Sequence, residues 1–291
     1  MLALALLLVP SRARASGCQT DSVVTHCAQN QAAYTGGNSL TTSTALTLTG
    51  TGDMVLIAAK VTASNNSISS GDITVSSTDC TGYTFHSIVD PVKSTNGEVD
   101  LFYTTGTASA SSCHFKMAIS ETNDDLAITA YDVPKGISVD VSNGQSLQES
   151  GGTLTPNTGS VTTNYASELL FWGLQGFISS GNTWGTLSDT NGTPTDDGPN
   201  NTTYGLFDPG HQITTSTGSY DVSRPATGTY SSAYYAQAAI AGIILATPTP
   251  TPTAYVPTPT PTPTPTPGPT STPTPTATPT PQANIPPITS W

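Results

Sequence analysis

Apolar and polar residues alternate with a period of two through much of this chain, between clusters of Gly, Asn, Asp and Ser. This alternation is the pattern of half-buried strands, because successive side chains of a strand point to opposite faces of a sheet. It is clear in TALTLTG, DITVSS, EVDLFYTTG and DDLAITAYDV. No window of about 12 residues before Ala246 shows the apolar face of a helix. The chain is therefore predicted to be all-β.

Three further segments are too rich in apolar residues to be half-buried: DMVLIAAKV, ELLFWGLQGF and YYAQAAIAGIILA. We expect them to be central strands that are covered on both faces. About ten to twelve short strands, spaced roughly ten residues apart, predict a two-sheet antiparallel sandwich. A jelly-roll-like topology is preferred. An immunoglobulin-like or concanavalin-like sandwich remains open, because strand order is not readable from one sequence.

The composition changes at Ala246, which marks the predicted end of a sandwich domain covering residues 16–246. Two thirds of the 24 prolines follow it, and no charged residue follows Arg224. Residues 247–281 are a Thr-Pro tract that is predicted to be disordered or in polyproline II, extending over roughly 110 Å as a stalk. Residues 282–291 are predicted to be unstructured. Such a stalk leads us to expect that the chain is part of a longer protein, and the alternative is that the tail itself contacts a surface.

The N-terminal sequence MLALALLLVPSRARASG predicts a signal peptide over residues 1–15, cleaved before Ser16. The basic segment that normally precedes the apolar run is missing, so we expect a truncated or misassigned start. A lipoprotein site at Cys18 is the alternative. The apolar run is far shorter than the ~20 residues of a membrane span. The expected location is secreted or at the cell surface, with no membrane span.

Four cysteines suit an oxidising compartment, and proximity in the sequence favours pairing Cys18 with Cys27 and Cys80 with Cys113. The alternation in CHFKMAIS directs Cys113 into a core. Only 9% of the residues are charged and the net charge is -12. Nucleic acid is excluded as a partner, because phosphate binding requires clustered Lys and Arg.

Known catalytic signatures are missing: the chain has no G-x-S-x-G, no H-E-x-x-H, no phosphate loop and no dinucleotide fingerprint. We therefore expect a protein that is not an enzyme and has no catalytic residue. The most irregular segment is GNTWGTLSDTNGTPTDDGPNNTTYGLFDPGHQ, residues 181–212. Long loops of this kind are often functional. Its aromatic residues, Trp184, Tyr204 and Phe207, are candidates for stacking on sugar rings, although a core position for Trp184 is the alternative.

The same loop carries oxygen ligands suited to a hard cation such as calcium, which is the one candidate cofactor. The candidate ligands are Asp189, Asn191, Asp196 and Asp197. They do not match the EF-hand pattern, since Thr193 and Pro194 interrupt it and no glutamate closes it. The alternative is a solvated Asp/Asn turn.

The Thr-Pro tract resembles the Pro-Thr linkers that join modules in secreted bacterial carbohydrate-active enzymes and surface proteins. EVDLFYTTG, DLAITAYDV, GSVTTNYASELLFWG and SSAYYAQAAIAGI resemble uncharacterised secreted β-sandwich domains of environmental bacteria, over about residues 40–246. This resemblance implies a fold and a location, and no active-site residues. Two functions are expected as alternatives. One is a non-catalytic module that binds a polysaccharide or cell-surface glycan, and the other is a structural or adhesive surface protein that self-associates through its sandwich.

Overall fold

The structure is a computed structural model, and it describes residues 18–32, 38–48, 52–62, 73–94, 97–104, 110–120, 125–134, 136–149, 153–176, 183–198, 200–201, 206–227, 234–246, Thr276 and Thr278. Every regular element in these ranges is a β-strand, which confirms the all-β prediction. Within the same ranges there is accordingly no apolar helix of the length needed to cross a bilayer.

The strands fall into an N-terminal half, residues 26–133, and a C-terminal half, residues 136–245. The N-terminal half contains β1 (His26–Ala32), β2 (Ser39–Thr41), β3 (Leu46–Leu48), β4 (Met54–Thr62), β5 (Thr74–Ser77), β6 (His86–Ser87), β7 (Val92–Ser94), β8 (Gly97–Thr104), β9 (Ala110–Cys113), β10 (Phe115–Ala118) and β11 (Asp125–Val133). The C-terminal half contains β12 (Gly136–Glu149), β13 (Thr153–Leu154), β14 (Val161–Thr162), β15 (Leu169–Gly176), β16 (Thr183–Trp184), β17 (Ser188–Asp189), β18 (Thr195–Asp196), β19 (Asn200–Asn201), β20 (Leu206–Ile213), β21 (Ser219–Tyr220), β22 (Val222–Ser223), β23 (Ala226–Thr227) and β24 (Tyr234–Leu245).

Each half contributes one large antiparallel sheet. The N-terminal sheet has the order β1-β11-β4-β8-β6, with β7 also paired to β8. The C-terminal sheet has the order β12-β24-β15-β20-β18, with β19 also paired to β20. Smaller sheets accompany them: β2-β10-β5 and β3-β9 in the first half, and β13-β23-β16, β14-β21 and β17-β22 in the second.

The two halves repeat one strand order. In each large sheet the first strand of the half pairs with its last strand, which then pairs with the long apolar strand β4 or β15. The sheet β2-β10-β5 corresponds position by position to β13-β23-β16, and β3-β9 corresponds to β14-β21. Among the described residues, β17-β22 is a sheet of the second half alone. The chain therefore contains an internal structural repeat that the alternation pattern did not reveal.

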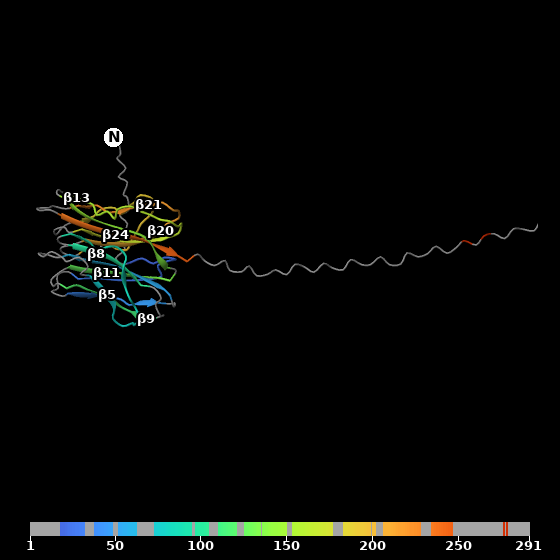
Figure 1. Cartoon of the computed structure of the whole chain (residues 1–291), viewed down its shortest axis with the longest axis horizontal. Helices are drawn as coiled ribbons and strands as arrows, with labels where there is room; N and C mark the ends of the chain where they lie inside the picture. The colour runs from blue at the N-terminus through green and yellow to red at the C-terminus, as the bar shows by residue number, and fades with distance from the viewer. Residues whose placement is uncertain are drawn as a thin grey trace, which may run out of the picture. The chain divides into compact units, whose positions relative to one another are not determined.

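The sheets are arranged in layers, as the labelled strands of Figure 1 show. The two large sheets face each other across a middle core that includes Leu56, Leu101, Phe171 and Ala241. The other face of the N-terminal sheet packs on β2, β5, β9 and β10 through a second core. The other face of the C-terminal sheet packs on β14, β21 and β22 through a third. In Figure 1, β5 and β9 accordingly lie on the side opposite to β13 and β21.

This layering explains the dense apolar segments. All nine residues of β4 and all eight of β15 are buried, as expected for strands that are covered on both faces. Residues 236–243 of β24 are buried as well. A single pair of sheets would leave one face of each strand in water. The described residues therefore form two large sheets and five smaller ones, where the sequence predicted two sheets in all.

The chain divides into two units, Met1–Thr247 and Pro248–Trp291. All 24 strands belong to the first unit. In the second unit Thr276 and Thr278 are described, and both are exposed. The predicted signal peptide, the rest of the Thr-Pro tract and residues 282–291 lie outside the described residues.

Both predicted disulfides are present. Cys18 is bonded to Cys27 and Cys80 to Cys113, and the described residues include no free cysteine. Cys113 is fully buried, in agreement with the inward phase predicted from CHFKMAIS.

Candidate functional site

A cavity of about 460 Å³ opens in the C-terminal half, at the predicted polar loop. Its lining consists of residues 190–193, which follow β17, residues 213–215 at the end of β20, and Tyr220 of β21. These residues supply threonine hydroxyls, an asparagine amide and the tyrosine ring, and no charged side chain lines the cavity. Ile213 adds an apolar surface, because 36% of this residue is exposed. The cavity therefore offers neutral hydrogen-bonding groups beside one apolar patch.

One wall of the cavity is held in place by Asp189, the last residue of β17. Its Oδ2 accepts a hydrogen bond from Gln212 Nε2 at 2.5 Å, and its Oδ1 accepts one from the Asp221 backbone N at 2.9 Å. The side chains of the next two residues are also bonded: Thr190 donates to Asp221 Oδ1, and Asn191 Nδ2 donates to Ser219 O at 2.5 Å. These bonds fix the loop against β21 and β22.

The opposite wall is fixed by reciprocal bonds between Thr214 and Glu168. Thr214 N donates to Glu168 O at 2.8 Å, and Glu168 N donates to Thr214 Oγ1 at 2.9 Å. Burial is the main reason why the pKa of Glu168 is raised to about 7. The hydrogen bond from the Tyr165 backbone amide lowers this pKa, and the neighbouring Asp140 carboxyl raises it further. Tyr220 donates its hydroxyl to Ser216 O at 2.8 Å. Hydrogen bonds thus hold both walls of the cavity in place.

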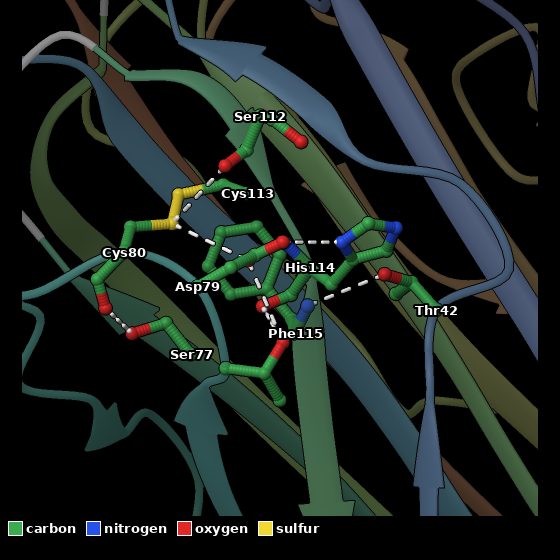
Figure 2. Close-up of polar contacts among 9 residues, drawn as sticks. Thr42, Ser77, Asp79, Cys80, Ser112, Cys113, His114 and Phe115 are labelled. Carbon is green, nitrogen blue, oxygen red and sulfur yellow. Dashed lines mark hydrogen bonds and ion pairs between the residues drawn. A yellow bond between two sulfur atoms is a disulfide. The ribbon is translucent and has the colours of Figure 1, made fainter.

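In the C-terminal half, the Asp189 carboxylate accepts a hydrogen bond from the Asp221 backbone N, and we call this Asp-to-amide contact the clasp. The N-terminal half carries the same clasp at the corresponding turn, shown in Figure 2. Asp79 Oδ1 accepts a hydrogen bond from the His114 backbone N at 2.6 Å, as Asp189 does from Asp221. Thr78 N donates to His114 O at 3.0 Å, which parallels the pairing of β17 with β22. The clasp is reinforced by a contact of 2.6 Å between Asp79 Oδ2 and His114 Nδ1. This hydrogen bond lowers the pKa of Asp79.

The two turns differ in the residues next to the clasp. In the N-terminal half the residue after Asp79 and the residue before His114 are Cys80 and Cys113, which form the disulfide drawn in Figure 2. In the C-terminal half the corresponding residues are Thr190 and Tyr220, and both line the cavity. The cavity therefore lies at the position that a disulfide occupies in the other half.

The predicted aromatic platform is corrected by the structure. Trp184 is only 3% exposed and packs with Leu154, Leu206 and Ala226, while the Arg224 guanidinium lies 5.7 Å from the centre of its ring. The core position considered as the alternative for Trp184 is thus the one observed. Phe207 is fully buried in the middle core. Neither ring has a face open to a sugar. Tyr204 lies outside the described residues.

The four predicted calcium ligands do not form one set. Asp189 and Asn191 are bonded at the cavity wall, whereas Asp196 pairs with Arg224 Nη1 at 2.9 Å. Asp197 is fully buried, accepts a hydrogen bond from the Tyr131 hydroxyl at 3.0 Å and contacts His211 Nδ1 at 2.7 Å. In the ranges that the structure covers, no group of three or more His, Cys, Asp or Glu side chains is placed to hold a metal ion.

Asp197 instead belongs to a buried network between the two halves. His211 contacts Asp197 on one side and Asp21 on the other, the latter at 3.4 Å from Nε2. Burial alone would lower the pKa of His211, but the hydrogen bonds and charges of Asp197 and Asp21 raise it overall. Gln19 N also donates to Asp197 Oδ1 at 2.8 Å. The network ties the N-terminal segment to β20.

Sequence reasoning located one wall of the cavity, since the predicted loop contains residues 190–193. It missed the second wall, residues 213–215 and Tyr220. The available signal was ITTSTGSY, a second run of hydroxyl residues directly after an apolar strand.

No protein-family model, no curated protein and no solved structure matches this chain.

Proposed function

We propose that the chain is a non-catalytic, secreted or cell-surface module that binds a carbohydrate in the cavity between residues 190–193 and 213–215. The observation that carries this proposal is the lining itself, which is neutral and rich in hydroxyl groups. A volume of about 460 Å³ lies within the range of roughly 300–1,000 Å³ that is usual for small-molecule sites. Sugar units fit such a lining because they combine many hydroxyl groups with apolar C-H faces.

Two features of the site support binding over an accidental hollow. Ile213 is exposed beside the hydroxyl groups, so a sugar can place an apolar face on it while its hydroxyls bond to the threonines. The walls are fixed by Asp189 and Glu168, so little conformational entropy is lost when a ligand binds.

We further propose that each half is a jelly-roll-like two-sheet sandwich, and that the module consists of two such units packed through their large sheets. The strand order supports this topology. In β1-β11-β4-β8, the first and the last strand of the half, β1 and β11, are neighbours. In β2-β10-β5, the second strand and the last but one, β2 and β10, are neighbours. The same relation holds for β12-β24-β15-β20 and β13-β23-β16.

The two disulfides are compatible with an oxidising, extracellular environment, and this supports the proposed location. The resemblance of the Thr-Pro tract to linkers of secreted bacterial proteins supports a role as a stalk. In this proposal the tract displays the double sandwich away from its point of attachment.

The alternative is a structural or adhesive surface protein. It is favoured by β12, a strand of 14 residues at the edge of its sheet. Edge strands present unpaired backbone groups that can pair with another chain. Ile137 near the start of this strand is 55% exposed, so the edge also carries an apolar side chain.

The experiment that tests the binding proposal is a glycan array followed by calorimetry on the full chain, with Thr193→Trp as the variant. The indole should fill the cavity and weaken binding at least about tenfold, a loss that corresponds to about 1.4 kcal/mol. Thr44→Trp, at an exposed threonine of the N-terminal half, is the matched control and should bind normally. Undiminished affinity in Thr193→Trp would place the site elsewhere. If no glycan bound, the structural alternative would take precedence.

A further inference from the structure

The hydrogen-bonding groups of the cavity wall are unevenly divided between donors and acceptors. Thr190 donates its hydroxyl hydrogen to Asp221 Oδ1, so only the lone pairs of its oxygen are left for a ligand. Asn191 uses one of its two amide hydrogens on Ser219 O, which leaves one N-H donor and the side-chain carbonyl as an acceptor. Acceptors thus outnumber donors in these two side chains, and the wall favours ligands that donate hydrogen bonds.

A buried acceptor without a partner lies directly behind the same wall. Gln212 is only 3% exposed, and its Nε2 donates to Asp189. Its Oε1 has no hydrogen-bond partner among the described residues. Gly192, which lines the cavity, lies directly against this oxygen: a Cβ at Gly192 would lie 2.6 Å from Gln212 Oε1 and 2.5 Å from Asp189 Oδ2. An unpaired buried acceptor is costly, so a ligand that donates a hydrogen bond to it would bind more favourably.

The charge around the cavity is negative. The carboxyl groups of Asp189 and Asp221 lie behind the wall, bonded to Gln212 and Thr190 respectively. After residue 135 the sequence contains a single basic residue other than histidine, Arg224. Its guanidinium is engaged by Asp196 at 2.9 Å and by Asp208 at 2.8 Å. No lysine or arginine in the C-terminal half is left to offset the two carboxyl groups, and the whole chain carries a net charge of -12. This field attracts cations and repels anions.

From these observations, and resting on the function proposed above, we infer that the cavity prefers saccharides with protonated amino groups, such as units of a 2-amino-2-deoxy sugar. An ammonium group has three donors and no acceptor, so it matches the acceptors of the wall and the unpaired Gln212 oxygen. An N-acetyl group replaces these with one donor and one carbonyl acceptor and removes the charge. A uronic acid brings a carboxylate, which Asp189 and Asp221 repel.

The test is calorimetry on the full chain with three tetrasaccharides: an oligomer of glucosamine, the matching oligomer of N-acetylglucosamine, and an oligomer of galacturonic acid. Titrations are done at mildly acidic pH, where the amine is protonated, at low and at physiological salt. We expect the glucosamine oligomer to bind about tenfold more tightly than the acetylated one, with an affinity that falls as salt is added. The galacturonic acid oligomer should not bind measurably.

Asp221→Asn isolates the role of charge, because an asparagine oxygen still accepts the bond from Thr190. It should reduce the preference for the amino sugar at least about threefold, with an unchanged melting temperature. Asp90→Asn removes the same charge from an exposed site in the N-terminal half and should leave the preference intact.

The outcomes separate this inference from the proposed function. Equal, salt-independent affinity for the amino and acetylated oligomers would overturn the inference and keep a carbohydrate site. A preference that persisted in Asp221→Asn would overturn the assignment to this wall. If no saccharide bound, the proposed function and the inference would both be wrong.

Discussion

Two carboxyl side chains are buried side by side on β8, and they make the stability of this protein sensitive to alkaline pH. Glu98 is fully buried and Asp100 is 1% exposed, and both lie on the face of β8 that carries Phe102, away from the middle core. Burial, followed by the charge of Glu98 and a hydrogen bond with it, raises the pKa of Asp100 from 3.8 to about 9. At neutral pH the pair therefore retains a proton.

The repeat supplies a comparison within the chain. Asp208 on β20, the strand that corresponds to β8, is also buried on the face away from the middle core. Burial raises its pKa as well, but the charge of Arg224 lowers it, and the result is about 7. The sign of the neighbouring charge thus accounts for the difference between the two strands.

The magnitude is set by proton linkage. The folded protein holds one more proton on Asp100 than the unfolded chain does between pH 3.8 and about pH 9. This contribution to the free energy of unfolding is complete below pH 3.8 and is lost as the pH rises towards 9. The loss is about 1.4 kcal/mol for each pH unit, or about 3 kcal/mol between pH 6 and pH 8. For a domain of this size that corresponds to roughly 6–12 °C in melting temperature.

Asp100→Asn removes the titrating group and keeps its shape. Urea unfolding at about pH 6, 7 and 8 measures the free energy of unfolding of both proteins. In the wild type this free energy should fall with pH more steeply than in the variant, by about 1.4 kcal/mol per pH unit. The variant should be the more stable protein at pH 8. Asp90→Asn, at an exposed aspartate, is the control, and its slope between pH 6 and 8 should equal that of the wild type. An Asp100→Asn variant with the wild-type slope would refute the shared proton.

Two single and two double variants test the buried ion pairs and the disulfides. Asp197→Asn should lower the free energy of unfolding at pH 6 by about 3 kcal/mol, because buried His211 loses its nearer charged partner and keeps only Asp21. Asp196→Asn should cost less, since Arg224 keeps Asp208, and equal losses would contradict the network. Replacing Cys80 and Cys113 by serine should cost about 4 kcal/mol, against about 2.5 kcal/mol for Cys18 and Cys27, because the loops they close span separations of 33 and 9 residues. Urea midpoints of the two double variants give the order, and the reverse order would contradict the loop-closure argument.

The sequence was sufficient wherever local pattern and local distance decide the structure. The apolar density of residues 54–62 and 169–176 predicted strands that are covered on both faces, because Lys60, Thr62 and Gln175 are too few polar side chains to form a face turned to water. Both disulfides were predicted from proximity along the chain. These features need no knowledge of which strands pair.

The features that were missed depend on pairing between distant strands. Trp184 stands beside a long polar loop, which suggested exposure, but its burial depends on Ala226 of β23 and Leu154 of β13. The repeat was invisible for the same reason. β4 reads MVLIAAKVT and β15 reads LLFWGLQG, and only their identical places in the two sheet orders show that they correspond.

The repeat also shows which residues distinguish the turn at the cavity from its counterpart. Both halves form the Asp-to-amide clasp at this turn, so the strand order alone does not decide which residues stand beside it. In the N-terminal half the two positions beside the clasp are cysteines, joined by a disulfide. Their counterparts, Thr190 and Tyr220, leave a space that neutral polar groups line. The residues placed on a shared backbone plan thus differ at the cavity, and function depends on such local differences rather than on the fold.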